Sequence, residues 1–169
     1  MNDITPTVAA IAQLHFEGNI IPHTWYKAIV FPNGKADVNA ILILAEIVYW
    51  YRPTVERNEA TGEIVSIRKK FKADMYQRHY QSFADQFGLT KRQCQDAIAR
   101  LIKLGLLRRE LRTVDTPQGK IGNVPYFEPV VEALQRVTFH VVTGEGSRSS
   151  GIALAPHGET YTKTPAKTY

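Results

Sequence analysis

The chain has 169 residues, 44% of them hydrophobic, which is enough for one domain with a sizeable core. Its longest apolar run, residues 41–51, is too short to span a membrane, and its single cysteine, Cys94, excludes an internal disulfide, so we expect a cytoplasmic protein without a membrane partner. The formal net charge is +5, but the stretch from Arg68 to Lys120 holds 13 Lys and Arg against 5 Asp and Glu, which is +8 and leaves −3 for the remainder. Such a basic third of the chain favours a polyanionic partner, although a solvated surface without a partner would have the same composition.

The N-terminal third predicts helices. Helical spacing of Val8, Ile11 and Leu14 predicts a helix over residues 5–16, and an aromatic segment, residues 23–31, follows it. Asp37 is a suitable cap for a helix over residues 38–51, which Pro53 ends. That helix is apolar on nearly every side, so we expect it at the centre of the core, with Glu46 either paired or reaching the helix edge.

The next segment changes from loop to strand. Residues 54–62 are polar and are expected to form a loop. Apolar and polar residues then alternate over 65–72, which predicts a strand with one strongly basic face. Lys70 and Lys72 lie on that face.

The basic third itself predicts two helices and two strands. Apolar residues at helical spacing predict a short helix over 79–87 and a longer one over 91–104. Thr90 and Gln93 form a capping box at the start of the second helix, and Gly105 is placed to end it. Strands are expected over 107–114 and 121–127, with a last helix over 128–136.

Helix, three-residue turn, helix and hairpin is the order of a winged helix-turn-helix. We therefore expect a mainly α fold with a small β-hairpin, in which this motif carries extra N-terminal helices. Residues 1–140 are expected to form this domain. Residues 141–169 are rich in Gly, Ser, Thr and Pro and are expected to be disordered.

The second helix of the motif has the composition of a DNA-reading element. Cys94, Ala97, Ile98 and Leu101 form its buried stripe, and the opposite face carries cations and amides that recognise base edges. Cations of the hairpin and of the basic strand are expected to hold phosphates. The DNA-binding candidates are Lys91, Arg92, Gln93, Gln95, Ala99, Arg100, Lys103, Arg109, Arg112, Lys120, Lys70 and Lys72.

Other kinds of site find no support in the pattern. The five histidines are scattered without metal-ligand spacing, and one cysteine cannot build a structural zinc site. Cys94 falls on an apolar stripe and is expected to be a buried core residue. We therefore expect no catalytic residues, no metal and no cofactor, and not an enzyme.

Three stretches together resemble a known group: residues 15–53, residues 69–107 with "ADQFGLTKRQCQDAIARLIKLGLL", and "NVPYFEPVVEAL". They are similar to the N-terminal winged-helix region of replication proteins from phages, prophages and plasmids of Gram-positive bacteria, described as DnaD-like or replisome-organiser proteins. The resemblance covers about residues 8–139. It implies binding to a replication origin and recruitment of a helicase or helicase loader.

Three hypotheses remain open at the level of sequence. The first is a replication-initiation module that binds double-stranded DNA, and the second is a transcriptional regulator of a mobile element that binds an operator. The third is a protein-interaction module of the same fold. A homodimer is compatible with each of them.

Overall fold

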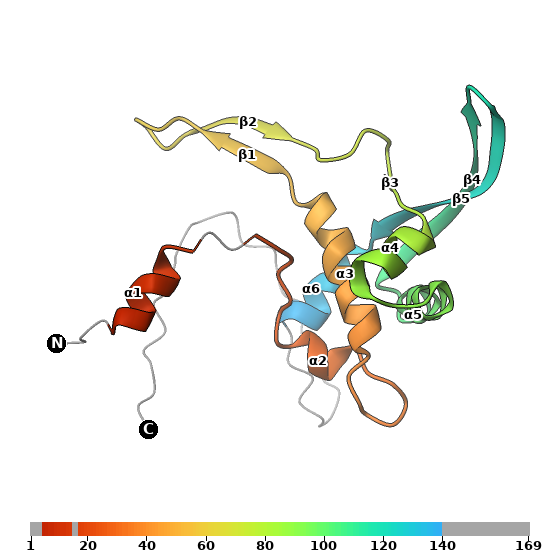
Figure 1. The fold of residues 1–169 in the computed structure, drawn as a ribbon, viewed down its shortest axis with the longest axis horizontal. Helices are drawn as coiled ribbons and strands as arrows, with labels where there is room; N and C mark the ends of the chain where they lie inside the picture. Colours follow the sequence, from red (N-terminus) through yellow and green to blue (C-terminus); the bar gives the residue numbers. More distant parts are fainter. Residues whose placement is uncertain (1–4, 15–16, 140–169) are drawn as a thin grey trace, which may run out of the picture.

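The computed structural model describes residues 5–14 and 17–139, which contain six helices and five strands (Figure 1). The predicted disordered tail lies outside these residues. The helices are α1 (Pro6–Ala12), α2 (Trp25–Ala28), α3 (Val38–Tyr51), α4 (Tyr80–Phe87), α5 (Lys91–Lys103) and α6 (Val131–Phe139). The strands are β1 (Thr54–Arg57), β2 (Ile64–Arg68), β3 (Tyr76–Gln77), β4 (Leu107–Thr116) and β5 (Gly119–Pro129).

Helix α3 is the centre of the core, as its all-round apolar sequence predicts. The Asp37 side chain caps it by accepting a hydrogen bond from the backbone N–H of Ala40 (3.2 Å), and Pro53 follows its end. Its side chains Ile41, Ile43, Leu44 and Ile47 are fully buried. Helices α2 and α5 and strands β3 and β5 all contact α3, so this helix is the element to which the rest of the domain is fixed.

The strands correct the expected fold class. Strand accounts for about 26% of the structure, in two antiparallel sheets with the orders β1-β2 and β3-β5-β4. "Mainly α with a small β-hairpin" is therefore wrong: the hairpin β4–β5 is long and forms a three-stranded sheet with β3. The winged helix-turn-helix assignment is unconfirmed.

The segment expected to be a loop contains β1, the first strand of the two-stranded sheet. Strand β1 pairs with β2 from Thr54↔Arg68 to Arg57↔Ile64, and the two strands project from the body as an arm (Figure 1). The polar sequence of residues 54–62 concealed β1, because both faces of a projecting strand are wet and its side chains need not alternate. Strand β2 also ends at Arg68, so the predicted basic strand stops before Lys70 and Lys72.

The two helices of the basic third form as predicted. Thr90 and Gln93 make the complete capping box at the start of α5, and Gly105 follows the end of α5 with φ 71°. Buried Phe83 of α4 and the α5 stripe of Cys94, Ala97, Ile98 and Leu101 join the main core. The predicted burial of Cys94 is confirmed, and this burial raises the pKa of its thiol.

Three helix boundaries differ from the predicted ones. Helix α1 is shorter than residues 5–16, the aromatic segment forms only the four-residue α2, and α6 begins at Val131 instead of residue 128. The last shift occurs because β5 continues through Glu128, which pairs with Arg108 of β4. Strand pairing therefore takes residues that the local pattern assigned to a helix.

Glu46, expected to be paired, is the buried centre of a hydrogen-bond network. Its carboxylate accepts from Arg78 Nη1 (2.6 Å), Asn19 Nδ2 (2.8 Å), Trp50 Nε1 (2.9 Å) and Gln86 Nε2 (3.0 Å). Burial acts to raise the pKa of Glu46, but these four donors outweigh it and hold the pKa below its ordinary value. The network joins α3 to α4 and to the segment before α2.

Replacing Glu46 with Gln tests this network. The variant leaves the Arg78 guanidinium, only 14% exposed, without its counter-charge, so the free energy of unfolding is expected to fall by about 3 kcal/mol. Urea denaturation measures this loss. The matched control is Glu56→Gln, which removes an exposed ion pair with Arg68 and is expected to cost less than about 1 kcal/mol. Equal losses in the two variants would show that the buried ion pair contributes no more to stability than the exposed one.

The same carboxylate predicts a pH dependence. Because the folded-state pKa of Glu46 is depressed, its stabilisation is complete above its ordinary value of 4.5 and is lost as the pH falls through the lower folded pKa. The stability difference between wild type and Glu46→Gln is therefore expected to shrink as the pH is lowered from about 7 to about 3. Parallel urea titrations along this pH series measure the difference. A constant difference would contradict the assignment.

Candidate nucleic-acid interface

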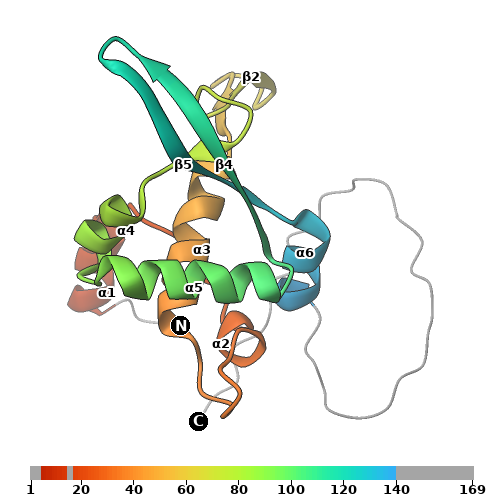
Figure 2. The same ribbon diagram turned by 90° about the vertical axis from the view of Figure 1, so that its right-hand side faces the viewer.

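Helix α5 lies across one side of the molecule, with the hairpin β4–β5 rising above it (Figure 2). Its buried stripe faces the core, and three other sides remain. Arg92, Ala99 and Lys103 are exposed on the side opposite the core. Arg92 is 82% exposed and pairs with Asp96 one turn later (3.0 Å), so its charge is partly balanced within the helix.

The two flanks of α5 have different roles. Lys91 and Gln95, one turn apart, face the hairpin and line a groove. Arg100 lies on the other flank, where its guanidinium donates to the Asp37 carboxylate (2.5 and 3.1 Å) and lies over the Phe31 ring. The bonds to Asp37 raise the pKa of Arg100. Arg100 thus fixes α5 to the start of α3 and does not line the groove.

The hairpin also has two different faces, because successive side chains of a strand alternate. Arg109 and Leu111 of β4 face the groove, and Arg109 Nη1 donates to the Tyr80 hydroxyl (2.9 Å). Arg108, Glu110 and Arg112 belong to the opposite face. Arg109 and Arg112, which the sequence suggested as equivalent phosphate contacts, therefore lie on opposite sides of β4.

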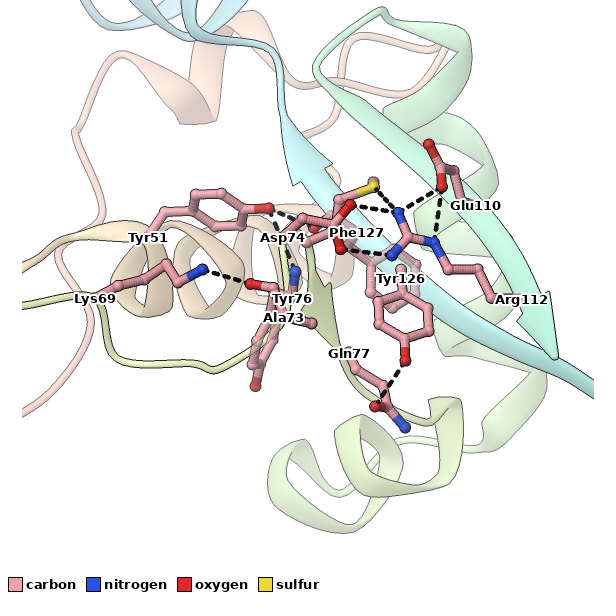
Figure 3. Close-up of polar contacts among 11 residues, drawn as sticks. Tyr51, Lys69, Ala73, Asp74, Tyr76, Gln77, Glu110, Arg112, Tyr126 and Phe127 are labelled. Carbon is pink, nitrogen blue, oxygen red and sulfur yellow. Dashed lines mark hydrogen bonds and ion pairs between the residues drawn. The ribbon is translucent and has the colours of Figure 1, made fainter. Parts of the chain in front are cut away.

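Arg112 is held by carboxylates (Figure 3). Its guanidinium donates to both Asp74 oxygens (2.6 and 2.8 Å) and to Glu110 (2.6 and 2.8 Å), and it lies over the Tyr126 ring. The bonds from Arg112 hold the pKa of Asp74 well below its usual range, and those to Asp74 and Glu110 raise the pKa of Arg112. This cluster fastens the loop before β3 to the hairpin, so Arg112 is a structural contact.

The groove lies between the start of α4, the first half of α5 and the inner face of the hairpin. Its volume is about 540 Å³. Among the described residues, neither Lys91 nor Arg109 has a carboxylate within ion-pair distance. The remaining lining side chains are mostly polar or aromatic: His79, Tyr80, Gln81, Gln95, Leu111, Asn123 and Pro125.

Four other predicted candidates lie outside the groove. The Gln93 side chain is used in the capping box, where its amide oxygen accepts from the Thr90 N–H (2.8 Å). Lys70 Nζ donates to the Tyr49 carbonyl (3.1 Å) and lies over the Tyr49 ring, so it packs against the end of α3. Lys72 is exposed before β3, and Lys120 is exposed at the hairpin tip, 3.8 Å from Asp115.

Sequence reasoning missed His79, Gln81 and Asn123 as groove residues. His79 and Gln81 belong to the start of α4, which the pattern showed only as an apolar stripe. Asn123 has φ 58°, a left-handed conformation that asparagine tolerates better than most residues, and this irregularity in β5 is not visible in the alternation. The one usable signal was the odd spacing of Arg109 and Arg112, which places them on opposite faces of a strand.

In residues 5–14 and 17–139 no helix is both long and apolar enough to cross a bilayer, and no cluster of three metal-ligating side chains occurs. Comparison of the chain with models of protein families, with curated proteins and with solved structures found no match. The resemblance to phage and plasmid replication proteins therefore stays a prediction from sequence.

The Arg112 cluster predicts coupled stability effects. Asp74→Ala and Arg112→Ala are each expected to lower the melting temperature, and the double variant to lower it by less than the two single losses together, because either change breaks the same bonds. A double-mutant cycle measured by thermal unfolding tests this. Lys120→Ala, which removes an exposed cation of the same hairpin, is the control and is expected to melt like wild type. Full additivity would show that Arg112 and Asp74 act independently.

Proposed function

We propose that this protein binds double-stranded DNA through the exposed side of α5 and the groove between α5 and the hairpin β4–β5. The observation that carries the proposal is the convergence of Lys91 and Arg109, two cations without a carboxylate partner among the described residues, on one polar groove. Unbalanced cations in a concave surface attract phosphates, because the local potential is focused there.

The surface also offers groups that can read bases. Gln95, Gln81 and Asn123 present amides at the groove, and Arg92 is exposed beside it. Amide and guanidinium groups form paired hydrogen bonds with adenine and guanine edges in the major groove. A helix fits that groove, and Arg109 on the hairpin is a cation without a carboxylate partner among the described residues, which suits a phosphate. We therefore assign base contacts to α5 and phosphate contacts to Lys91 and Arg109.

The DNA we propose is a replication origin of a phage or another mobile element. The support for this choice is the sequence resemblance, including its implication of a helicase or helicase loader as a further partner. An operator would use the same surface. Genome-wide mapping of bound DNA separates the two: sites clustered at an origin support the proposal, and sites confined to promoters would replace it with a regulator.

Alanine at Lys91 or Arg109 is expected to weaken binding to specific and random duplexes by similar factors. A variant that lacks one phosphate contact displaces fewer counterions from the DNA when it binds. The slope of log affinity against log salt should therefore become shallower by about 0.9. Fluorescence anisotropy at several salt concentrations measures both quantities. The matched control is Arg136→Ala, an exposed cation of α6 outside this surface, which is expected to leave affinity and slope unchanged. An equal effect of all three variants would show that binding depends on the overall positive charge of the protein and not on this surface.

Base reading is tested separately with Gln95→Ala and Arg92→Ala. Each is expected to lower the preference for the specific over the random duplex by roughly 5-fold or more, as removal of a base contact does. Competition binding between the two duplexes measures this ratio. Lys103→Ala, on the same helix but two turns from its N-terminal half, is the comparison for loss of charge alone. If the preference is unchanged in both test variants, α5 does not read the sequence.

A further inference from the structure

Helix α1 has the composition of a buried helix but is fully exposed. Its residues, Pro6–Ala12, include no charged side chain, and every residue from Thr5 to Leu14 is exposed. Val8 and Ile11 of α1 and Leu14 just after it are apolar and are 54%, 51% and 57% exposed; together they are the stripe. A helix of two turns is marginal on its own in water, because its nucleation cost is offset mainly by packing of an apolar face. We therefore expect the stripe to pack against another apolar surface.

The body of the protein offers a matching surface, a groove of about 270 Å³ between α2, α3 and α6. Its lining is mostly apolar, with Trp25, Val48 and Leu134 among its residues, and includes the polar residues Arg52, Gln135 and Thr138. Three of the lining side chains are largely exposed, namely Ile20 (62%), Val131 (60%) and Phe139 (77%). An uncharged helix can enter such a groove without removing a charge of its own from water.

We propose that α1 of one copy of this chain docks in the α2–α3–α6 groove of a second copy, and that the exchange is reciprocal. In both ribbon views α1 stands apart from the α2–α3–α6 side of its own chain (Figures 1 and 2). The segment after it is fixed to the body, since Asn19 bonds to Glu46 and Thr24 and Trp25 bond to Thr138. No residue from Thr5 to Leu14 lines the groove of its own chain.

The exchange has the size that a stable dimer needs. Each copy contributes six apolar side chains that are more than half exposed, namely two on α1, Leu14 just after it and three at the groove, so a two-fold exchange covers twelve. Side chains of this size present on the order of 1,000 Å² together, which approaches the area of specific interfaces. A two-fold axis makes the two contacts identical and closes the assembly at two chains.

This surface is distinct from the proposed DNA interface. No residue that lines the α2–α3–α6 groove also lines the groove between α5 and the hairpin. Docking of α1 therefore uses a different groove from the proposed DNA contacts, and the inference does not depend on the proposed function.

Crosslinking of mixed variants that each carry one introduced cysteine identifies the occupant. Full-length Ile11→Cys and a mass-tagged Phe139→Cys are mixed and treated with a short flexible bis-maleimide; Cys94 is buried in both and serves as an internal blank. The expected product is a heterodimer that carries one chain of each kind. Ala9→Cys, on the opposite side of α1, replaces Ile11→Cys in the control and is expected to crosslink much less. Heterodimer yields that are equal with Ile11→Cys and Ala9→Cys would overturn the proposal.

Sedimentation equilibrium supplies the thermodynamic test. Ile11→Asp is expected to raise the dimer dissociation constant by about 30-fold or more, as loss of a central interface side chain does. Gln13→Asp, away from the stripe, is expected to leave it within a few-fold of wild type, and circular dichroism checks the fold of each variant. Two outcomes would overturn the exchange: a wild-type chain that is monomeric at about 100 μM, or a dimer insensitive to Ile11→Asp. A third would be crosslinking that occurs within one chain carrying both Ile11→Cys and Phe139→Cys but not between two chains.

Discussion

The buried carboxylate of Glu46 is the constraint on which the arrangement of the helices depends. A single charge at the centre of an apolar helix is costly unless every oxygen lone pair finds a donor, and here four side chains from three segments supply the donors. Arg78, which carries the counter-charge, also donates to Ser82 and Gln86 of α4 and lies over the Phe83 ring. The direction of α4 is thereby set by polar contacts as well as by Phe83 in the core.

Helix α5 follows from α4 through a short and well-determined connection. Gly88 adopts φ 66° after the last turn of α4, and Thr90 begins α5 with its capping box. Arg100 then ties the far half of α5 to Asp37 at the start of α3. The start and the middle of α3 thus each contribute a carboxylate that orients one of the two helices, so α3 decides the position of the exposed α5 face.

The charge count of the basic third overstates the positive field that the surface presents. Four of its arginines pair with carboxylates from outside that stretch: Arg68 with Glu56, Arg78 with Glu46, Arg100 with Asp37 and Arg108 with Glu128. Arg92, Arg112 and Lys120 pair within it. Lys91, Lys103 and Arg109 are the cations near α5 and the hairpin that have no such partner among the described residues, which concentrates the available charge at α5 and its groove.

The sequence predicted those features that depend on neighbours in the chain. The cap at Asp37, the capping box at Thr90, the central α3 and the burial of Cys94 all follow from spacing within one turn or one helix. It missed β1, because all four of its residues are exposed, and β3, because a strand of two residues is too short to show an alternation. It also could not show that Arg100 and Arg112 are structural contacts, because each is held by a carboxylate far away in the chain, 63 residues for Arg100 and 38 for Arg112.

The composition of α3 is explained once all of its sides are taken together. Asp37 and Glu46 serve α5 and α4, and the Tyr51 hydroxyl donates to the Phe127 carbonyl of β5 (2.8 Å), which joins the sheet to the helix end. The remaining side, with Ala45, Val48 and Arg52, borders the open groove that α2 and α6 also line. A helix that is apolar all round normally has core on every side. The side of α3 that still borders open space is therefore the place where the fold is incomplete as a single copy, and the uncharged α1 is the element whose own exposure matches it.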